Sequence, residues 1–174
     1  MYFFTSDEHY GHKNIIKYCN RPFNSVEEMD QELIRRHNLL VSSEDVVIHA
    51  GDFTLKKKQK AHDYISCLNG KHIFLRGSHD AWLGTVGNTH EIWEQTIQEQ
   101  HIVVCHYAMR VWSRSHYNSW QLFGHSHGTL KPIGKQLDIG VDCHDFYPLS
   151  FDQVLKIMKS RPDNPNKGGR MKVD

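Results

Sequence analysis

Residues 2–9 of the chain read YFFTSDEH, a short apolar run that passes directly into acidic and imidazole side chains. Aromatic and β-branched residues bounded by polar ones are typical of a buried strand, so we expect a strand over residues 2–6. Asp7 and His9 then follow the end of that strand. Because side chains at positions i and i+2 of a strand or tight turn point the same way, these two can share or bracket one metal ion.

The same arrangement recurs further along the chain. Other strands are expected over residues 45–49, 72–76, 102–106, 120–124 and 136–141. The first four of them run into Gly51-Asp52, Gly77-Ser78-His79-Asp80, His106 and Gly124-His125-Ser126-His127. The glycine before Asp52, Ser78 and His125 lets the backbone come close to neighbouring segments without a steric conflict. We therefore expect the ends of five strands to gather candidate ligands.

Helical patterns separate the first strands. A helix is expected over residues 25–40, where Ser25 and Glu28 form a capping-box pattern. Its apolar face comprises Met29, Leu33, Ile34 and Leu40. A second helix is expected over residues 56–68 and a final one over residues 151–158. The inward face of the second comprises Ala61, Tyr64, Ile65 and Leu68. Helices alternating with strands, followed by strand after strand, indicate an α/β half joined to a more antiparallel half.

Length and composition set the frame for these elements. A chain of 174 residues has room for one domain with a hydrophobic core, which we assign to residues 1–160. Residues 161–174 are polar and rich in proline and glycine, so we expect a flexible C-terminal tail. The net charge of +1 favours neither polyanions nor acidic membranes as partners. Four scattered cysteines, with no secretory leader or membrane span in the sequence, predict a soluble protein of the cytoplasm.

Fourteen histidines are the unusual feature of the composition. Imidazole nitrogen together with carboxylate oxygen suits Mn, Fe, Zn, Co or Ni, whereas calcium and magnesium sites are nearly all oxygen. A lone histidine is more often a hydrogen-bonded core residue or a solvated surface residue than a ligand. We assign that ordinary role to most of His37, His62, His72, His90, His101 and His144.

No one of these motifs is specific, but the ordered set is. Asp7-x-His9, Gly51-Asp52, Gly77-Ser78-His79-Asp80, His106 and Gly124-His125-Ser126-His127 together resemble the five signature blocks of the calcineurin-like metallophosphoesterases. The segments 5–23 and 141–144 further resemble small single-domain bacterial or phage members. The resemblance implies a four-layer α/β/β/α sandwich of two mixed sheets flanked by helices. It also implies two divalent metal ions, with Mn foremost and Fe, Zn, Ni or Co as alternatives.

The resemblance also assigns roles to residues. It implies a first metal ion bound by Asp7, His9, Asp52 and His127, and a second bound by Asp52, Ser78, His106 and His125. A hydroxide bridging the two ions would attack phosphorus in line. By the same analogy His79 lies beside the substrate phosphate, and Asp80 orients His79. Glu8 is expected to face solvent rather than to bind metal.

Position 78 departs from the family pattern, which usually reads Gly-Asn-His where this chain has Gly-Ser-His. A serine hydroxyl is shorter than an asparagine amide, so it reaches a metal ion only if the loop moves in or through a water molecule. We therefore expect a weaker second metal site and slower turnover than in an asparagine version.

Substrate recognition is less determined, because the same machinery attacks phosphomonoesters and phosphodiesters. Polar candidates beside the cluster are His12, Asn14, Arg76, Arg110, Arg114 and His116. Residues 107–119 form a candidate loop over the site, where Trp112 and Tyr117 are available to stack on a base or sugar. The expected function is hydrolysis of small or cyclic nucleotide-type phosphodiesters in an open pocket. A phosphomonoesterase or pyrophosphohydrolase, and a catalytically weakened metal-binding scaffold, are the alternatives. Nucleic acid is a compatible partner, a membrane is not expected, and the oligomeric state is left open.

Overall fold

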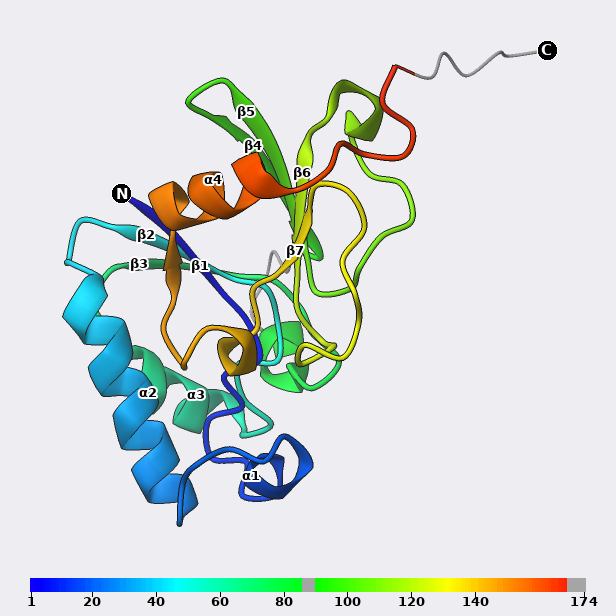
Figure 1. The fold of residues 1–174 in the computed structure, drawn as a ribbon. Helices are drawn as coiled ribbons and strands as arrows, with labels where there is room; N and C mark the ends of the chain where they lie inside the picture. Colours follow the sequence, from blue (N-terminus) through cyan, green and yellow to red (C-terminus); the bar gives the residue numbers. More distant parts are fainter. Residues whose placement is uncertain (86–89, 169–174) are drawn as a thin grey trace.

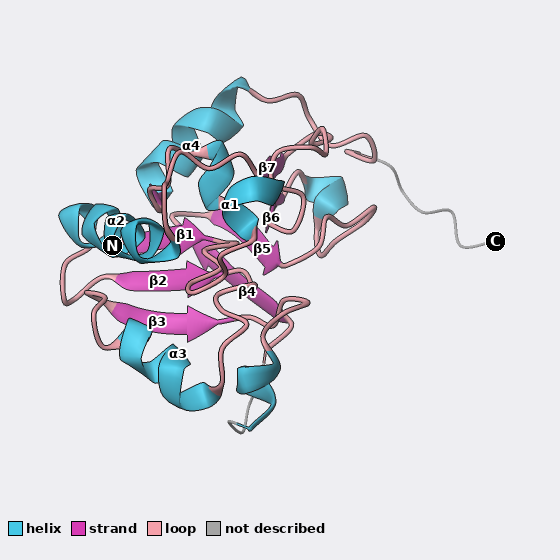
Figure 2. Cartoon of the chain, turned by 90° about the horizontal axis from the view of Figure 1, so that it is seen from below, coloured by secondary structure: helices cyan, strands magenta, loops and turns pink. Residues whose placement is uncertain are grey.

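The expected first strand forms β1, Tyr2–Thr5, in a computed structural model that describes residues 1–85 and 90–168. Strand β1 lies at the centre of a four-stranded sheet with the order β3-β2-β1-β8. The other members are β2 (Val46–His49), β3 (Lys71–Phe74) and β8 (Leu149–Ser150). Strands β1, β2 and β3 are mutually parallel, as the arrows in Figure 2 show, and β8 pairs antiparallel with β1.

A second four-stranded sheet has the order β4-β5-β6-β7. It comprises β4 (Ile92–Ile97), β5 (Gln100–Cys105), β6 (Trp120–Phe123) and β7 (Gln136–Asp138). Only β4 and β5 pair antiparallel, while β5, β6 and β7 are parallel. The expectation of a more antiparallel second half is therefore wrong for most of this sheet. Residues 106–119 and 124–135 supply connections of the length that a parallel crossover needs.

The described residues also form four α-helices: α1 (Ile15–Tyr18), α2 (Val26–Leu40), α3 (Lys58–Ile65) and α4 (Phe151–Ser160). Short 3-10 turns cover Ala81–Thr85, Ser115–Tyr117 and Val141–Cys143. The hydroxyl of Ser25 accepts a hydrogen bond from the Glu28 backbone N–H, as expected at the start of α2. The Glu28 carboxylate, however, accepts from the backbone N–H of Asn24 and not of Ser25, so only half of the capping box forms.

The period-2 alternation of the central strands divides the core. Phe4 and Ile48 point into a cluster with residues of the second sheet and of α4, whereas Phe3 and Val47 point to the opposite face. Helices α2 and α3 pack into a further cluster around Met29, and Figure 1 shows α2 and α3 on one side of β1–β3 with α4 on the other. The result is a mixed α/β fold in which the first sheet is covered on both faces.

Two sequence expectations need correction in the helices and strands. Leu40, expected on the apolar face of α2, is 41% exposed, and His37 is buried in its place. One helical turn separates His37 from Leu33, so the buried stripe follows the 3.6-residue period more closely through His37. Strands β4 and β8 were not expected, because β4 carries mixed polar residues and β8 is only two residues long.

Residues 161–168 were expected to belong to the flexible tail, yet in the structure they pack against the second sheet's loops. Asn164 is buried and donates to the carbonyl oxygens of Ser115 and Ser119. The Arg161 guanidinium donates to the carbonyls of Pro132 and Gly134. The packed part thus extends beyond α4, and residues 169–174 lie outside the described residues.

All four cysteines are free, and they range from buried Cys105 to exposed Cys67. Within residues 1–85 and 90–168, the structure contains no helix with the length and apolar character needed to cross a membrane.

Candidate metal centre

The parallel pairing brings the ends of distant strands together. Strands β1, β2 and β3 run in the same direction, so the loops that follow them meet at one edge of the first sheet. The loop after β6 reaches that edge as well, because the His125 backbone N–H donates to both carboxylate oxygens of Asp7 at 3.1 and 2.9 Å. Loops of both sheets therefore contribute to one cluster of imidazoles and carboxylates.

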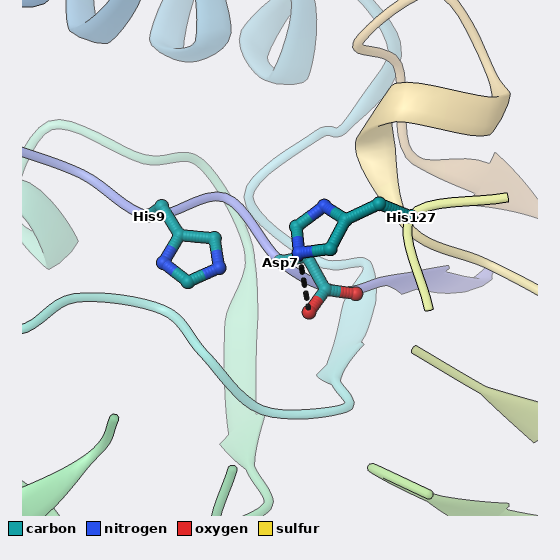
Figure 3. A group of neighbouring side chains, drawn as sticks. All are labelled: Asp7, His9 and His127. Carbon is teal, nitrogen blue, oxygen red and sulfur yellow. Dashed lines mark ion pairs between the residues drawn. The ribbon is translucent and has the colours of Figure 1, made fainter. Parts of the chain in front are cut away.

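The first donor group consists of Asp7, His9 and His127, which Figure 3 shows around a common space. One ligand atom of each residue lies within 4.8 Å of those of the other two. An ion pair joins His127 Nε2 to Asp7 Oδ1 at 4.0 Å. These separations leave room for a cation to sit among the three atoms.

The second donor group consists of Asp52, His106 and His125. His106 Nε2 lies 3.4 Å from Asp52 Oδ2. The same Asp52 oxygen lies 3.8 Å from His9 Nε2 of the first group. Asp52 thus stands between the two groups, in the place where the family resemblance implies a bridging carboxylate.

Two buried nitrogens give a test of whether a metal ion fits these groups. The described residues hold five buried side-chain atoms without a hydrogen-bond partner, and two of them, Nε2 of His9 and Nε2 of His106, belong to the donor groups. Leaving a buried polar atom unpaired costs about 1–3 kcal/mol, and native structures rarely do so without a reason. Each nitrogen lies near the Asp52 carboxylate, so a divalent cation bound there would use both lone pairs. Nitrogen and carboxylate donors together match the transition metals expected from the sequence.

Backbone strain is concentrated in the same residues. A left-handed φ is uncommon for a residue with a side chain, and holding one costs on the order of 1–3 kcal/mol. Five members of the two groups have φ between 46 and 67°: Asp7, His9, Asp52, His125 and His127. Such strain persists only where surrounding structure enforces it, and it is typical of functional sites.

The glycines of the motifs allow the close approach that was expected. A Cβ atom at Gly124 would lie 2.0 Å from Ser6 Oγ and 2.4 Å from Asp7 Oδ2. A Cβ atom at Gly77 would lie 2.3 Å from both the backbone nitrogen and Oδ1 of Asp52. Any larger residue at either position would push a carboxylate of the cluster out of place.

The pKa values of the two donor carboxylates, Asp7 and Asp52, are shifted in opposite directions. Burial raises the pKa of Asp7 to about 7, and burial lowers the pKa of His9 to about 3. Burial also opposes ionisation of Asp52, but the adjacent His106 and the His79 backbone N–H outweigh it and lower the pKa of Asp52 below its usual value. Asp52 is therefore the carboxylate that carries a negative charge most readily, even before a cation binds.

A buried salt bridge supports the first group from behind. The Arg21 guanidinium makes two hydrogen bonds of 2.8 Å to the Asp142 carboxylate and donates to the carbonyl oxygens of Asp7 and Glu8. Asp142 in turn lies 2.7 Å from His127 Nδ1, which leaves Nε2 of that ring directed at Asp7. The sequence points to the segment around Asp142 through the family resemblance. It does not point to Arg21, because a single arginine outside any motif gives no signal of a functional role.

Ser78 and His79 lie beside Asp52. The Ser78 hydroxyl donates to Asp52 Oδ2 at 3.0 Å, and the His79 backbone N–H donates to Asp52 Oδ1 at 2.8 Å. The His79 ring is 45% exposed, with Nε2 4.0 Å from Asp52 Oδ2. This ring is available to a molecule that enters from solvent.

Asp80 has a different role from the one expected. Its carboxylate accepts hydrogen bonds from the backbone N–H groups of Asp52, Phe53 and Gly77, and from the indole of Trp82. None of its hydrogen bonds in the described structure comes from the His79 ring. Asp80 therefore fixes the loop that carries Asp52, and the prediction that it orients His79 is wrong.

Glu8 is buried, not solvent-facing, because its side chain turns away from the metal groups into the core. Its Oε1 lies 2.6 Å from His49 Nδ1, and His49 Nε2 lies 3.0 Å from His72 Nδ1. Burial raises the pKa of Glu8 to about 7 and lowers that of His49 to about 3. Glu8 thus lies between two donor residues in the sequence, while its side chain packs on His49 and not in the donor group.

Two comparisons place the chain among known proteins, and no family model matches it. It is 31% identical to the uncharacterized protein MJ1445 of Methanocaldococcus jannaschii over 166 residues, which covers 90% of each chain. The chain belongs to the MJ1445 family. A crystal structure of the protein of unknown function AQ665 from Aquifex aeolicus has a similar fold, with a TM-score of 0.71 at 20% identity. That similarity covers 90% of this chain and 98% of AQ665.

Of the substrate residues expected in this MJ1445-family chain, the structure brings only His12 to the metal groups. Its ring lies 5.3 Å from that of His9, centroid to centroid, and lines the same cleft. Asn14 precedes α1 without lining the cleft, and Arg76 lies beside Gly84. Arg114 lines a separate pocket with Tyr117 on the β4–β5 side, and the His116 ring contacts that of Tyr117 at a tilt of 46°.

The expected stacking loop, residues 107–119, reaches the site of the MJ1445-family chain with its first residue, since the Tyr107 ring lies 4.9 Å from that of the donor His125. The segment that carries Arg110, Trp112 and Tyr117 lies apart from the cleft. Trp112 is buried, and its indole N–H donates to the carbonyl of Ser119. Arg110 lines a further pocket with Trp112. The loop folds onto the second sheet because its polar and aromatic side chains find partners within it.

Proposed function

We propose that this protein is a phosphoesterase that uses two divalent metal ions to hydrolyse small phosphodiesters. The observation that carries the proposal is the pair of donor groups on either side of Asp52, with His9 Nε2 and His106 Nε2 buried and unpartnered. Their residues are those of the ordered calcineurin-like blocks. The resemblance also supports a four-layer α/β/β/α arrangement as the finer description of the fold, and the four free cysteines support a cytoplasmic location.

The residues divide the work as follows. Asp7, His9, Asp52 and His127 would hold one ion, and Asp52, His106 and His125 the other. Two such ions, when bound, neutralise charge that develops on phosphoryl oxygens and lower the pKa of water towards neutrality.

The His79 imidazole lies at the open side of the donor groups, where it can donate a hydrogen bond or a proton to the departing ester oxygen. Its backbone N–H holds Asp52 Oδ1, so ring position and carboxylate position are linked. Asp80 keeps the Asp52 loop in its strained conformation through the backbone N–H groups described above.

The test combines metal content with activity. Purified protein is loaded with Mn, analysed for bound metal, and assayed with bis-p-nitrophenyl phosphate and with p-nitrophenyl phosphate. We expect about two ions per chain and faster hydrolysis of the diester. Asp52→Ala should lose both metal and activity, whereas His79→Ala should keep the metal and lose about 10²–10⁴-fold in rate.

Three outcomes would count against the proposal. Full metal content in Asp52→Ala would remove Asp52 from the bridging position. Faster hydrolysis of the monoester would favour the phosphomonoesterase alternative. Metal binding without hydrolysis of either ester would favour the weakened scaffold, for which the Ser78 hydroxyl on the Asp52 carboxylate is the supporting observation.

A further inference from the structure

The cleft at the metal groups has two chemically different ends. It has a volume of about 540 Å³ and is lined at one end by the donor residues and His79. At the other end it is lined by Ile15, Tyr18 and Leu55, which belong to α1 and to the loop before α3. A ligand whose phosphate lies among the donors therefore extends over an apolar surface.

Tyr18 is the prominent side chain of that apolar end. It is 71% exposed, and Leu55 across the cleft is 43% exposed. Ile15, one turn before Tyr18 on α1, is buried and anchors the short helix. Tyr18 thus presents an open aromatic face from an anchored backbone.

A row of rings connects the donor groups to Tyr18. The His12 ring centroid lies 5.3 Å from that of His9, 6.3 Å from that of His79 and 6.2 Å from that of Tyr18. The Tyr18 ring meets His12 at 76°, edge to face, so this contact leaves at least one wide face of the tyrosine uncovered. The His12 ring therefore lies between the donor groups and Tyr18.

The charged residues around the cleft limit the number of phosphate groups that the ligand can carry. Among the residues that line the cleft in the described structure there is no lysine or arginine. The Arg21 guanidinium is buried behind the donor groups on Asp142, and the Lys56 side chain passes over Gly11. A second phosphate group beyond the donors would lack the cationic partners that polyphosphate sites provide.

We propose that His12, Tyr18 and Leu55 form a subsite for a phosphodiester substrate. The subsite would take a flat aromatic part of the esterified group, such as the base of a nucleotide. This inference rests on the proposed function and specifies its substrate class. Stacking on an exposed aromatic side chain accepts every base, so the subsite selects nucleotide-type esters over alkyl esters without reading their sequence.

The test measures binding of two ligands that share a phosphate group and differ in the group esterified to it, a nucleoside in one and a methyl in the other. Dissociation constants of thymidine 5′-monophosphate and methyl phosphate are measured by calorimetry on the Mn-loaded protein. We expect the nucleotide to bind more tightly. In Tyr18→Ala its dissociation constant should rise on the order of tenfold, with methyl phosphate unchanged.

Two variants serve as controls. Tyr18→Phe keeps the ring and should bind both ligands as the parent does. Tyr117→Ala removes a similarly exposed tyrosine, 77% exposed, that lines no part of this cleft and should change neither constant.

The outcomes separate this inference from the proposed function. A parent protein that hydrolyses bis-p-nitrophenyl phosphate but binds both ligands equally would overturn the subsite alone. Equal weakening of both ligands in Tyr18→Ala would do the same, since it would indicate a change at the phosphate. A parent that neither binds Mn nor hydrolyses the diester would overturn the proposed function together with the subsite.

Discussion

Single side chains decide how well the two donor groups can hold a cation, and position 78 is the clearest case. The Ser78 hydroxyl donates to Asp52 Oδ2 at 3.0 Å, so in the structure it is engaged with that carboxylate. Asp52, His106 and His125 then provide the donors of that group. A longer side chain with a carbonyl oxygen at position 78 would add one more.

We therefore expect Ser78→Asn to raise metal occupancy at the second site and to increase turnover of bis-p-nitrophenyl phosphate at limiting Mn. The reason is the added amide oxygen beside Asp52. Elemental analysis and a Mn titration of the rate measure the two effects. Unchanged or lower values for both would show that position 78 does not limit the site.

Arg21 is a second residue with a large expected effect. Its side chain is fully buried, and it joins Asp142 to the carbonyl oxygens of the Asp7 loop. Arg21→Met keeps the volume but leaves the Asp142 carboxylate buried without its guanidinium, which should cost about 3–5 kcal/mol of unfolding free energy.

Urea unfolding of the metal-free protein measures this cost. Arg35→Met is the matched control, because Arg35 is exposed on α2 and pairs with Glu32 at the surface. A midpoint for Arg21→Met equal to that of Arg35→Met would contradict a supporting role of Arg21.

At the scale of elements, α2 and β3 enclose a group of histidines on the side of the first sheet opposite the second. Burial lowers the pKa of His37 on α2, and of His72 on β3, to about 4 in each case. The unfolded chain binds a proton at each near pH 6.5, whereas the folded chain does so only near pH 4. Stability contributed by these groups is therefore present above about pH 6.5 and is lost as pH falls towards 4.

His37→Gln should flatten this acid limb, because glutamine can still donate to the Asn69 carbonyl but does not titrate. The slope of unfolding free energy between pH 6 and 4.5 should fall by at most about 1.4 kcal/mol per pH unit, the value for one proton. Urea unfolding with a chelator present measures the slope. The exposed His62 on α3 provides the control variant His62→Gln, and equal slopes in both variants would contradict the prediction.

Elements with a strong periodic pattern could be predicted from the sequence. The strands around Phe4 and Ile48 and the helix around Met29 appear where expected, because continuous apolar runs and a 3.6-residue stripe leave few alternatives. Strand β4 could not be predicted, because its residues do not alternate clearly between apolar and polar. Its extended conformation is stabilised by antiparallel pairing with β5. Parallel pairing of β5 with β6 depends on the path of a connection that carries no periodic signal.

The candidate site shows the same division. Asp7, His9, Asp52, His106, His125 and His127 were all expected from their motifs, and the structure brings them together. Arg114 and His116 were expected near the site only because of their position in the sequence, and local packing carries their loop elsewhere. Glu8 was misjudged because its burial depends on His49, forty-one residues away.

For the whole molecule, the donor groups connect the two sheets. Asp7, His9 and Asp52 come from loops of the first sheet, whereas His106, His125 and His127 follow strands of the second. Each proposed ion would therefore join both sheets. Because a cation that binds only the folded chain stabilises it by mass action, metal should raise the melting temperature.

We expect a chelator to lower the melting temperature of the Mn-loaded protein by several degrees, and added Mn to restore it. An excess of one hundred times the dissociation constant corresponds to about 2.7 kcal/mol. Calorimetric melting measures the change, with Asp52→Ala as the comparison that should respond little. If neither the chelator nor added Mn changes the melting temperature of the parent protein, the proposal that ions bind to residues of both sheets is wrong.

The hydrogen bond between His125 and Asp7 spans 118 residues of chain. A ribosome that adds about 5–20 residues per second needs roughly 6–24 s to make that stretch. During this interval Asp7 and His9 are already synthesised, but the other side chains of the donor groups are not yet complete. The proposed ions would therefore gain their full set of donors only after His127, residue 127 of 174, has been synthesised.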